Sequence, residues 1–357
     1  MKKFIIGSKK VGLNLPTYFI ADIAANHDGN LNKAIDLVHS CAEAGANAAK
    51  FQHFSAETIV SDRGFKSLNK KFLSHQKKWK KSVFEVYKDA SINLKWTTKL
   101  KQACKEAKVD FLSTPYSYFL ADHLYKHIPA YKIGSGDANW IEFISYVAKK
   151  KKPILIATGA TNIKEVENLV KSIYKINKKI VLMQCNTNYT GQQNNLEYVN
   201  LNVLDTFKTK YKNSVILGLS DHTFGHVAVL GAVAKGARVI EKHFTDNNKR
   251  IGPDHHFAMN PKTWKEMVKA TRDLEKTLGD GIKKVEKNEI NAKIVQQRSI
   301  RAIKLIKKGD KLKRKDLICL RPKSNQGLEP YFLSKILGTR AKKNIKKHEE
   351  LNWKKIK

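Results

Sequence analysis

Two histidines, His222 and His243, stand at the ends of two short apolar runs that are rich in β-branched residues. They are 21 positions apart, which is the length of one strand–helix unit, so neighbouring parallel strands would bring their imidazoles together. The pair is either two hydrogen-bonded structural histidines or two ligands of one divalent ion. A two-histidine site with room for water and substrate oxygens suits Mn²⁺, Zn²⁺ or Mg²⁺ acting as a Lewis acid.

Two lysines, Lys50 and Lys132, are embedded in the apolar runs AAKFQHF and AYKIGSGD, where an ordinary surface lysine is out of place. Hydroxyl groups at the ends of nearby runs (Thr114, Ser135 and Ser220) would complete a phosphate-binding cradle. The other polar residues at strand ends are Asp22, Asn26, His27, Gln52, Ser113, Asp137, Thr158, Asn186, Thr187, Tyr189, Asp221, Glu241 and Lys242. Polar residues at every strand end indicate a functional cluster.

The elements that must position these residues are eight apolar runs, which alternate with amphipathic, helix-like stretches. The runs begin at Tyr18, Ala48, Val109, Ala130, Pro153, Ile180, Val215 and Arg238. Eight such βα units predict an α/β fold, a closed (β/α)8 TIM barrel, with a doubly wound open sheet as the alternative. The active site of such a barrel lies at the carboxyl ends of its strands, where the polar residues stand.

The chain is long enough, at 357 residues, for a second domain. We predict a barrel domain at 1–281, a charged linker at 282–297 and a small β-rich domain at 298–357. The long insert after the second strand, Ser55 to Ser91, is rich in lysine, serine and aromatic residues. We expect it to form an elaborated loop over the barrel mouth.

The net charge is +36, from 68 basic and 32 acidic residues, but only nine of the basic residues are arginines. Because base readout and bidentate phosphate recognition favour arginine, we expect non-specific retention on polyanions but no specific nucleic-acid partner. The four cysteines are far apart and form no CxxC motif, which predicts reduced thiols and a cytoplasmic location. No apolar run has the length of a membrane span, so no membrane partner is expected.

The sequence resembles the sialic acid (N-acetylneuraminate) synthase family of phosphoenolpyruvate-dependent condensing enzymes. The matching motifs are ADIAANHDG (21–29), KFQ (50–52), STPY (113–116), YKIGSGD (131–137), GLSDHT (218–223), EKHFTD (241–246) and GPDH (252–255). The C-terminal part, from SIRAIKLIKKGD to LGTRAKKNIKKHE, resembles the family's antifreeze-like (SAF) domain. The resemblance covers nearly the whole chain, in order.

The resemblance implies that phosphoenolpyruvate condenses with the aldehyde of an N-acetylmannosamine-type sugar, giving a nine-carbon 2-keto acid and phosphate. It makes His222 and His243 the ligands of a divalent metal, with Mn²⁺ preferred to Mg²⁺ or Co²⁺. It also implies a domain-swapped homodimer in which Arg321 reaches the neighbouring subunit's site. Phosphoenolpyruvate would be held by Lys50, Thr114, Lys132, Ser135 and Ser220, and the amino sugar oriented by Gln52, Tyr189 and Asp254.

The sequence departs from the family pattern at four positions of the expected site. Asp22 and Asp137 stand where the family usually has glutamate, Ala157 where many members have a phosphate-binding serine, and Thr187 where asparagine is common. We expect Asp137 to manage the proton of the attacking water and Asp22 that of the new sugar alcohol.

Three questions remain open at this level. The acceptor is N-acetylmannosamine, its 6-phosphate, or a diacetamido sugar that leads to legionaminic or pseudaminic acid. A Schiff-base aldolase that uses Lys132 as its nucleophile is one alternative function. A non-catalytic, polyanion-binding protein built on a degenerate barrel is the other.

Overall fold

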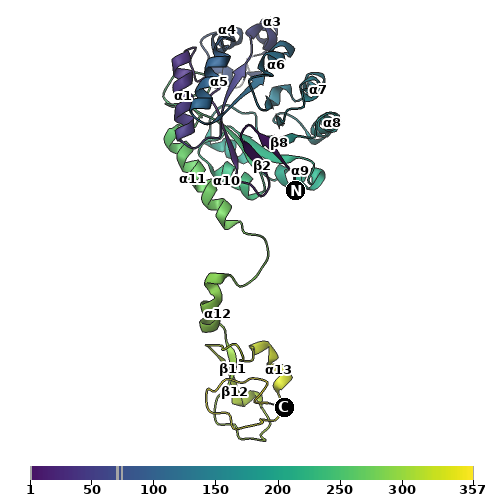
Figure 1. The fold of residues 1–357 in the computed structure, drawn as a ribbon, viewed down its shortest axis with the longest axis vertical. Helices are drawn as coiled ribbons and strands as arrows, with labels where there is room; N and C mark the ends of the chain where they lie inside the picture. The colour runs from purple at the N-terminus through teal and green to yellow at the C-terminus, as the bar shows by residue number, and fades with distance from the viewer. Residues whose placement is uncertain (1, 70–71, 74, 357) are drawn as a thin grey trace. The chain divides into compact units, whose positions relative to one another are not determined.

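The computed structural model describes residues 2–69, 72–73 and 75–356, so residues 70–71 and 74 of the predicted insert lie outside it, as do both terminal residues. The chain divides into two compact units, Met1–Gly279 and Asp280–Lys357 (Figure 1). The first unit is a closed barrel of eight parallel strands, in the order β10-β3-β4-β5-β6-β7-β8-β9. This closure confirms the predicted TIM barrel and excludes the doubly wound sheet.

The barrel strands coincide with the eight apolar runs of the sequence. They are almost wholly buried, because helices cover their outer face and side chains fill the interior. Their bounds are β3 Tyr18–Asp22, β4 Ala48–His53, β5 Asp110–Pro115, β6 Tyr131–Ile133, β7 Ile154–Ala157, β8 Ile180–Cys185, β9 Ile216–Asp221 and β10 Val239–His243.

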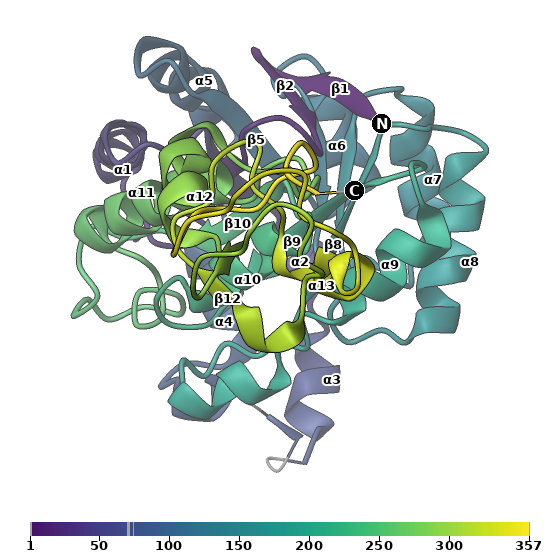
Figure 2. The ribbon, with the colours of Figure 1, turned by 90° about the horizontal axis from the view of Figure 1, so that it is seen from below.

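Helices surround the barrel and bury apolar faces against the strands, and several of them are seen around its circumference in Figure 2. Most are amphipathic, whereas α10 consists only of apolar residues and glycine. They are α1 Leu31–Glu43, α5 Trp96–Glu106, α6 Tyr118–Leu124, α7 Ile141–Lys149, α8 Ile163–Tyr174, α9 Val203–Tyr211, α10 Val227–Ala234 and α11 Pro261–Thr277. In the described residues, no helix combines the length and the apolar character that a membrane span requires.

A hairpin that the sequence reading did not predict precedes the barrel. It is formed by β1 (Lys3–Ile6) and β2 (Lys9–Gly12), which pair antiparallel. Ile6 and Val11 are fully buried and pack with the side chains that fill the barrel interior. The hairpin therefore closes the end of the barrel opposite the strand ends that carry the polar residues.

The predicted insert lies at the other end of the barrel unit, as expected (Figure 1). It contains the short helices α2 (Ala56–Ile59), α3 (Asp62–Ser67) and α4 (Val83–Ala90). Helix α4 begins with a complete capping box between Ser82 and Glu85, which fixes its start.

The second unit has its own apolar core and a small antiparallel sheet of β11 (Ser299–Ala302) and β12 (Leu317–Leu320), which confirms the expected β-rich domain. It also holds helix α13 (Leu333–Ile336). Helix α12 (Ile290–Gln296) lies within the stretch predicted as a linker.

Candidate active site

Register places three site residues at one level of the barrel. His243 on β10 lies opposite Asp22 on β3, and Asp22 lies opposite Lys50 on β4. The first of these pairings exists only because the barrel closes and brings the last strand beside the first. The carboxyl ends of the strands thus converge on one mouth, as the fold requires.

A buried cluster of opposite charges lies at this mouth. The side chain of Lys50 is 2% exposed, and its Nζ is 2.8 Å from Asp22 Oδ2 and 3.9 Å from Glu241 Oε2. The Nζ of Lys132, also nearly inaccessible, is 3.2 Å from Glu241 Oε1. Burial alone would lower the pKa of Lys50, but the carboxylates of Asp22 and Glu241 raise it above its ordinary value. Lys50 therefore stays cationic although it is buried at the mouth of the barrel.

Glu241 joins the two lysines, a role that its position at a strand end did not reveal. Its Oε1 accepts a hydrogen bond from Ser220 Oγ at 3.2 Å, whereas its buried Oε2 has no hydrogen-bond partner among the described residues. Thr114 Oγ1 lies 3.5 Å from Lys50 Nζ. The lysines and two of the three predicted hydroxyls thus form one connected group, as a site for an anionic substrate needs.

The third hydroxyl, that of Ser135, belongs to a neighbouring part of the mouth. It accepts a hydrogen bond from the backbone N–H of Gly159 at 3.0 Å. A Cβ at Gly159 would lie 1.9 Å from Thr187 Oγ1 and 2.9 Å from Ser135 Oγ, so the two hydroxyls converge where only glycine fits. Ala157 supplies no hydroxyl, and that of Thr158 donates to the backbone of β8.

The two histidines lie side by side, with ring centroids 5.4 Å apart. His222 Nδ1 is 2.9 Å from the carbonyl oxygen of Asn186, and since a carbonyl can only accept, Nδ1 carries the proton and Nε2 is the coordinating atom of the neutral ring. Burial lowers the pKa of His222, but Cys185 and the Asn186 carbonyl raise it above its ordinary value. Burial lowers the pKa of His243 to about 4, so its ring is neutral near pH 7. The buried Nδ1 of His243 has no hydrogen-bond partner in the described structure.

These features fit a divalent ion held by two imidazole nitrogens, one on each ring. The ring of His243 is neutral near pH 7, a neutral His222 offers Nε2, and an orphaned buried nitrogen is what a ligand site without its ion leaves. Among the described residues, no group of three or more histidine, cysteine, aspartate or glutamate side chains is placed to hold a metal. Such an ion would therefore have to complete its coordination with water or substrate oxygens.

The remaining predicted residues line a pocket beside this cluster. Asp254 is partly buried, with Oδ2 3.8 Å from His243 Nδ1, and desolvation raises its pKa despite the opposing effect of His243. Gln52 Nε2 donates to Asp22 Oδ2 at 3.2 Å, and the ring of Tyr189 lies 4.3 Å from that of His222, centroid to centroid.

Asp137, which lines the same pocket, has a pKa raised to about 6 by burial. The nearby Lys132 opposes this shift without cancelling it. A carboxyl group that changes protonation near pH 6 is suited to general acid–base chemistry.

Several polar strand-end residues serve the fold and do not face the pocket. Lys242 Nζ pairs with Asp221 Oδ2 and donates to the carbonyl of Thr223 at 2.6 Å, all within buried surroundings. Asn26 Nδ2 donates to the backbone carbonyl of Phe244. Arg321, predicted to complete the sugar site, is an exposed residue of the second unit directly after β12.

Sequence reasoning missed an aromatic wall of the pocket, formed by Phe54, Trp79, Tyr87 and Tyr116. Three of these rings lie in or beside the insert, where no periodic pattern predicts which side chains face the pocket. The position of Tyr116 in the STPY motif directly after β5 was the one available signal.

Comparison with known proteins gives the site its context. Residues 37–283 match the model of the NeuB family, and residues 297–357 match that of the SAF domain. The chain belongs to the NeuB family. This confirms the resemblance drawn from the motifs.

Named relatives and a solved structure agree with this assignment. The N,N'-diacetyllegionaminic acid synthase of Legionella pneumophila is 32% identical over 99% of this chain and 98% of its own length. The human N-acetylneuraminate-9-phosphate synthase is 28% identical over 77% of this chain and 75% of its own length. The crystal structure of the N-acetylneuraminic acid synthetase of Leptospira borgpetersenii, in complex with citrate, has a TM-score of 0.71 and 28% identity, covering 82% of this chain and 95% of its own. These NeuB-family relatives support a synthase of the sialic acid type.

Proposed function

We propose that this NeuB-family protein condenses phosphoenolpyruvate with the open-chain aldehyde of an N-acetylmannosamine-type sugar, releasing phosphate and a nine-carbon 2-keto acid. The observation that carries the proposal is the buried group of Lys50, Lys132, Asp22 and Glu241 beside the His222–His243 pair. Two desolvated ammonium groups attract a substrate that carries both a phosphate and a carboxylate. Paired imidazoles supply the ligands for a divalent ion, of which Mn²⁺ is our first choice.

The residues of the chain divide the work as follows. Lys50 and Lys132, with the hydroxyls of Thr114, Ser135 and Ser220, hold phosphoenolpyruvate with its C3 toward the aldehyde. A divalent ion on His222 and His243 would supply Lewis-acid polarisation of the aldehyde oxygen. Gln52, Tyr189 and Asp254 orient the sugar around that carbonyl, because all three line the pocket.

Two carboxylates move the protons of the reaction. Asp137 takes a proton from the water that adds at C2, since its pKa of about 6 leaves it ionised at neutral pH yet able to accept a proton. Asp22 manages the proton that converts the alkoxide, formed from the aldehyde, into the sugar alcohol. Its Oδ2 lies 3.8 Å from His243 Nε2. The tetrahedral adduct at C2 then expels inorganic phosphate.

We further propose that the enzyme acts as a domain-swapped homodimer. Arg321 follows an apolar strand and precedes a proline, which fixes the backbone that carries its guanidinium fork. Such a fork would bind the acyl carbonyl of a sugar in the partner's barrel.

The Schiff-base alternative is disfavoured by the surroundings of Lys132. A nucleophilic lysine must be a neutral amine, whereas the carboxylate of Glu241, 3.2 Å away, stabilises an ammonium group. Treatment with borohydride in the presence of sugar and pyruvate would trap such an adduct, and we expect none.

The test is release of inorganic phosphate from phosphoenolpyruvate on addition of N-acetylmannosamine, its 6-phosphate or a diacetamido sugar. We expect release that depends on sugar and on divalent metal, with one nine-carbon acid formed per phosphate. Phosphoenolpyruvate without sugar is the control for simple hydrolysis. Absence of release with every sugar, at saturating Mn²⁺, would refute the proposal.

A further inference from the structure

The pocket beside the lysines contains about 350 Å³ and has two kinds of wall. One wall is polar and comes from strand ends and the loops that follow them, including Gln52, Asp137 and Asp254. The other comes largely from the insert and the segments flanking it. The polar wall is where the reacting aldehyde must lie, so the insert side faces the end of the sugar remote from the aldehyde.

This pocket lacks basic residues other than histidine. Nearly one residue in five of the chain is lysine or arginine, 68 of 357, yet none lines the pocket in the part of the chain that the structure describes. Its ionisable lining residues include two carboxylates, Asp137 and Asp254. A second phosphate, carried by the acceptor, would meet no lysine or arginine among the described lining residues, and the guanidinium of Arg321 is assigned above to the acyl carbonyl of the sugar.

The insert side is instead a continuous aromatic wall. The ring centroids of Trp79 and Tyr87 are 6.5 Å apart, those of Tyr87 and Phe54 5.4 Å, and those of Phe54 and Tyr116 5.8 Å. Val86 adds an aliphatic surface beside them. Aromatic rings of this kind pack against methyl groups and the apolar faces of sugars.

The hydroxyl groups of this wall stay neutral. Burial raises the pKa of Tyr116 well above its ordinary value, and that of Tyr87 rises for the same reason with a contribution from Asp254. Neutral phenols donate hydrogen bonds to amide carbonyls without repelling or attracting charge. Both features suit an acyl-amide substituent.

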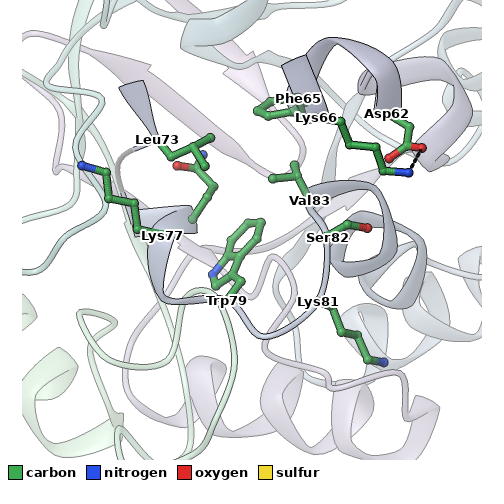
Figure 3. Close-up of a pocket in the computed structure, with 10 residues that line it drawn as sticks. Asp62, Phe65, Lys66, Leu73, Lys77, Trp79, Lys81, Ser82 and Val83 are labelled. Atoms are coloured by element: carbon green, nitrogen blue, oxygen red, sulfur yellow. Dashed lines mark hydrogen bonds and ion pairs between the residues drawn. The ribbon is translucent and has the colours of Figure 1, made fainter. Parts of the chain in front are cut away.

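Lysines do occur on the other side of Trp79. A second pocket, of about 540 Å³, shares Trp79 and Gln76 with the first, and Lys66, Lys77 and Lys81 line it (Figure 3). In Figure 3 Val83 is the labelled apolar side chain near the indole of Trp79, while Lys77 and Lys81 point away from it. Lys66 and Lys81 are paired with Asp62 and Asp89 at 2.6 Å. Trp79 therefore separates the active-site pocket from these cations.

We propose that the acceptor is an uncharged sugar whose end remote from the aldehyde is apolar or acylated, and that Trp79 and Tyr87 select it. This inference rests on the proposed function and decides among its acceptors. A 2,4-diacetamido-2,4,6-trideoxyhexose has such an end, with a methyl group and an acetamide. N-acetylmannosamine has a hydroxymethyl group there, and its 6-phosphate has a dianion.

The first experiment compares these three sugars at fixed, saturating phosphoenolpyruvate, with phosphate release as the readout. We expect kcat/KM to be highest for the diacetamido trideoxyhexose and at least tenfold lower for N-acetylmannosamine 6-phosphate, a difference of about 1.4 kcal/mol. A preference for the 6-phosphate would overturn the inference while leaving the proposed function intact. Failure of all three sugars would instead refute the proposed function.

The second experiment changes the wall. Trp79→Ala should raise KM for the preferred sugar about tenfold, with KM for phosphoenolpyruvate unchanged, because of the two substrates only the acceptor would lie against this ring. Trp79→Phe should restore most of the loss. Trp79→Lys places an ammonium group in the wall and should shift the kcat/KM ratio toward the 6-phosphate at least tenfold.

The matched control is Phe119→Ala, which removes an aromatic ring that is 66% exposed on α6 and does not line the pocket. It should change neither Michaelis constant. Circular dichroism and thermal unfolding of every variant show that the barrel has folded. If folded Trp79→Ala and Trp79→Lys keep the wild-type KM and sugar preference, Trp79 does not select the acceptor.

Discussion

Replacing Lys50 by methionine tests whether the buried charges at the barrel mouth are energetically coupled. The change keeps the unbranched shape and most of the volume of the side chain but removes the ammonium group 2.8 Å from Asp22. Asp22 would keep the amide of Gln52 and the backbone N–H of Ala24, at 3.2 and 3.1 Å, but no adjacent cation. Breaking a buried pair by removing one partner costs about 3–5 kcal/mol.

The free energy of unfolding, measured with urea and followed by circular dichroism, should fall by that amount in Lys50→Met. The double variant Lys50→Met/Asp22→Asn removes both charges and should recover a large part of the loss. The matched control is Lys66→Met, because Lys66 also pairs with an aspartate, at 2.6 Å, but is 68% exposed. That control should leave the free energy of unfolding nearly unchanged, because an exposed ion pair is screened by solvent.

Activity provides the second readout of the same substitution. If Lys50 holds phosphoenolpyruvate, Lys50→Met raises KM for that substrate or lowers kcat by orders of magnitude, while Lys66→Met leaves both unchanged. Equal unfolding free energies for Lys50→Met and the wild type would refute the coupling derived from the structure. Wild-type kinetics in folded Lys50→Met would refute the role of this lysine in binding.

Three further predictions concern protons, metal and the second unit. Asp137 acts in its ionised form, so kcat/KM should fall tenfold per pH unit below about pH 6. Asp137→Asn should lose this acidic limb of the pH–rate profile together with most of the activity. An unchanged acidic limb in Asp137→Asn would assign it to another group. Exhaustive chelation should abolish activity and Mn²⁺ should restore it. His222→Ala and His243→Ala should each lose the Mn²⁺ binding that calorimetry measures, and full turnover of the chelated enzyme would contradict a metal site. We expect nearly no activity from Arg321→Ala or His243→Ala alone, but activity when the two chains are mixed, because a mixed dimer has one complete site. Wild-type activity of Arg321→Ala alone would exclude an arginine that acts in trans.

The sequence was sufficient to predict the barrel and the level at which its chemistry lies. The ammonium group of a lysine within an apolar strand can be accommodated in a closed barrel mainly at the mouth, which is why Lys50 and Lys132 could be singled out. Their partners could not be assigned, because strand spacing does not say which side chains meet across the closed sheet. The role of Glu241 depends on register between β9 and β10 and on rotamers that no linear pattern encodes.

The insert and the hairpin were the least predictable parts for a different reason. Trp79 and Tyr87 belong to short irregular segments, where tertiary packing decides whether a ring turns inward. The β1–β2 hairpin consists of two strands of four residues, too short for an alternating pattern to stand out. Elements that depend on contacts made far along the chain leave little local signature.

The pairing of β10 with β3 has a consequence for how this protein is made. Asp22 leaves the ribosome more than two hundred residues before its neighbour His243. Until then β3 presents an open edge of hydrogen-bonding groups, and a nascent chain of seven strands can neither complete the histidine pair nor protect that edge. Synthesis of this protein thus passes through an interval in which the open edge of β3 is prone to aggregation, and a chain truncated between β9 and β10 keeps that edge open.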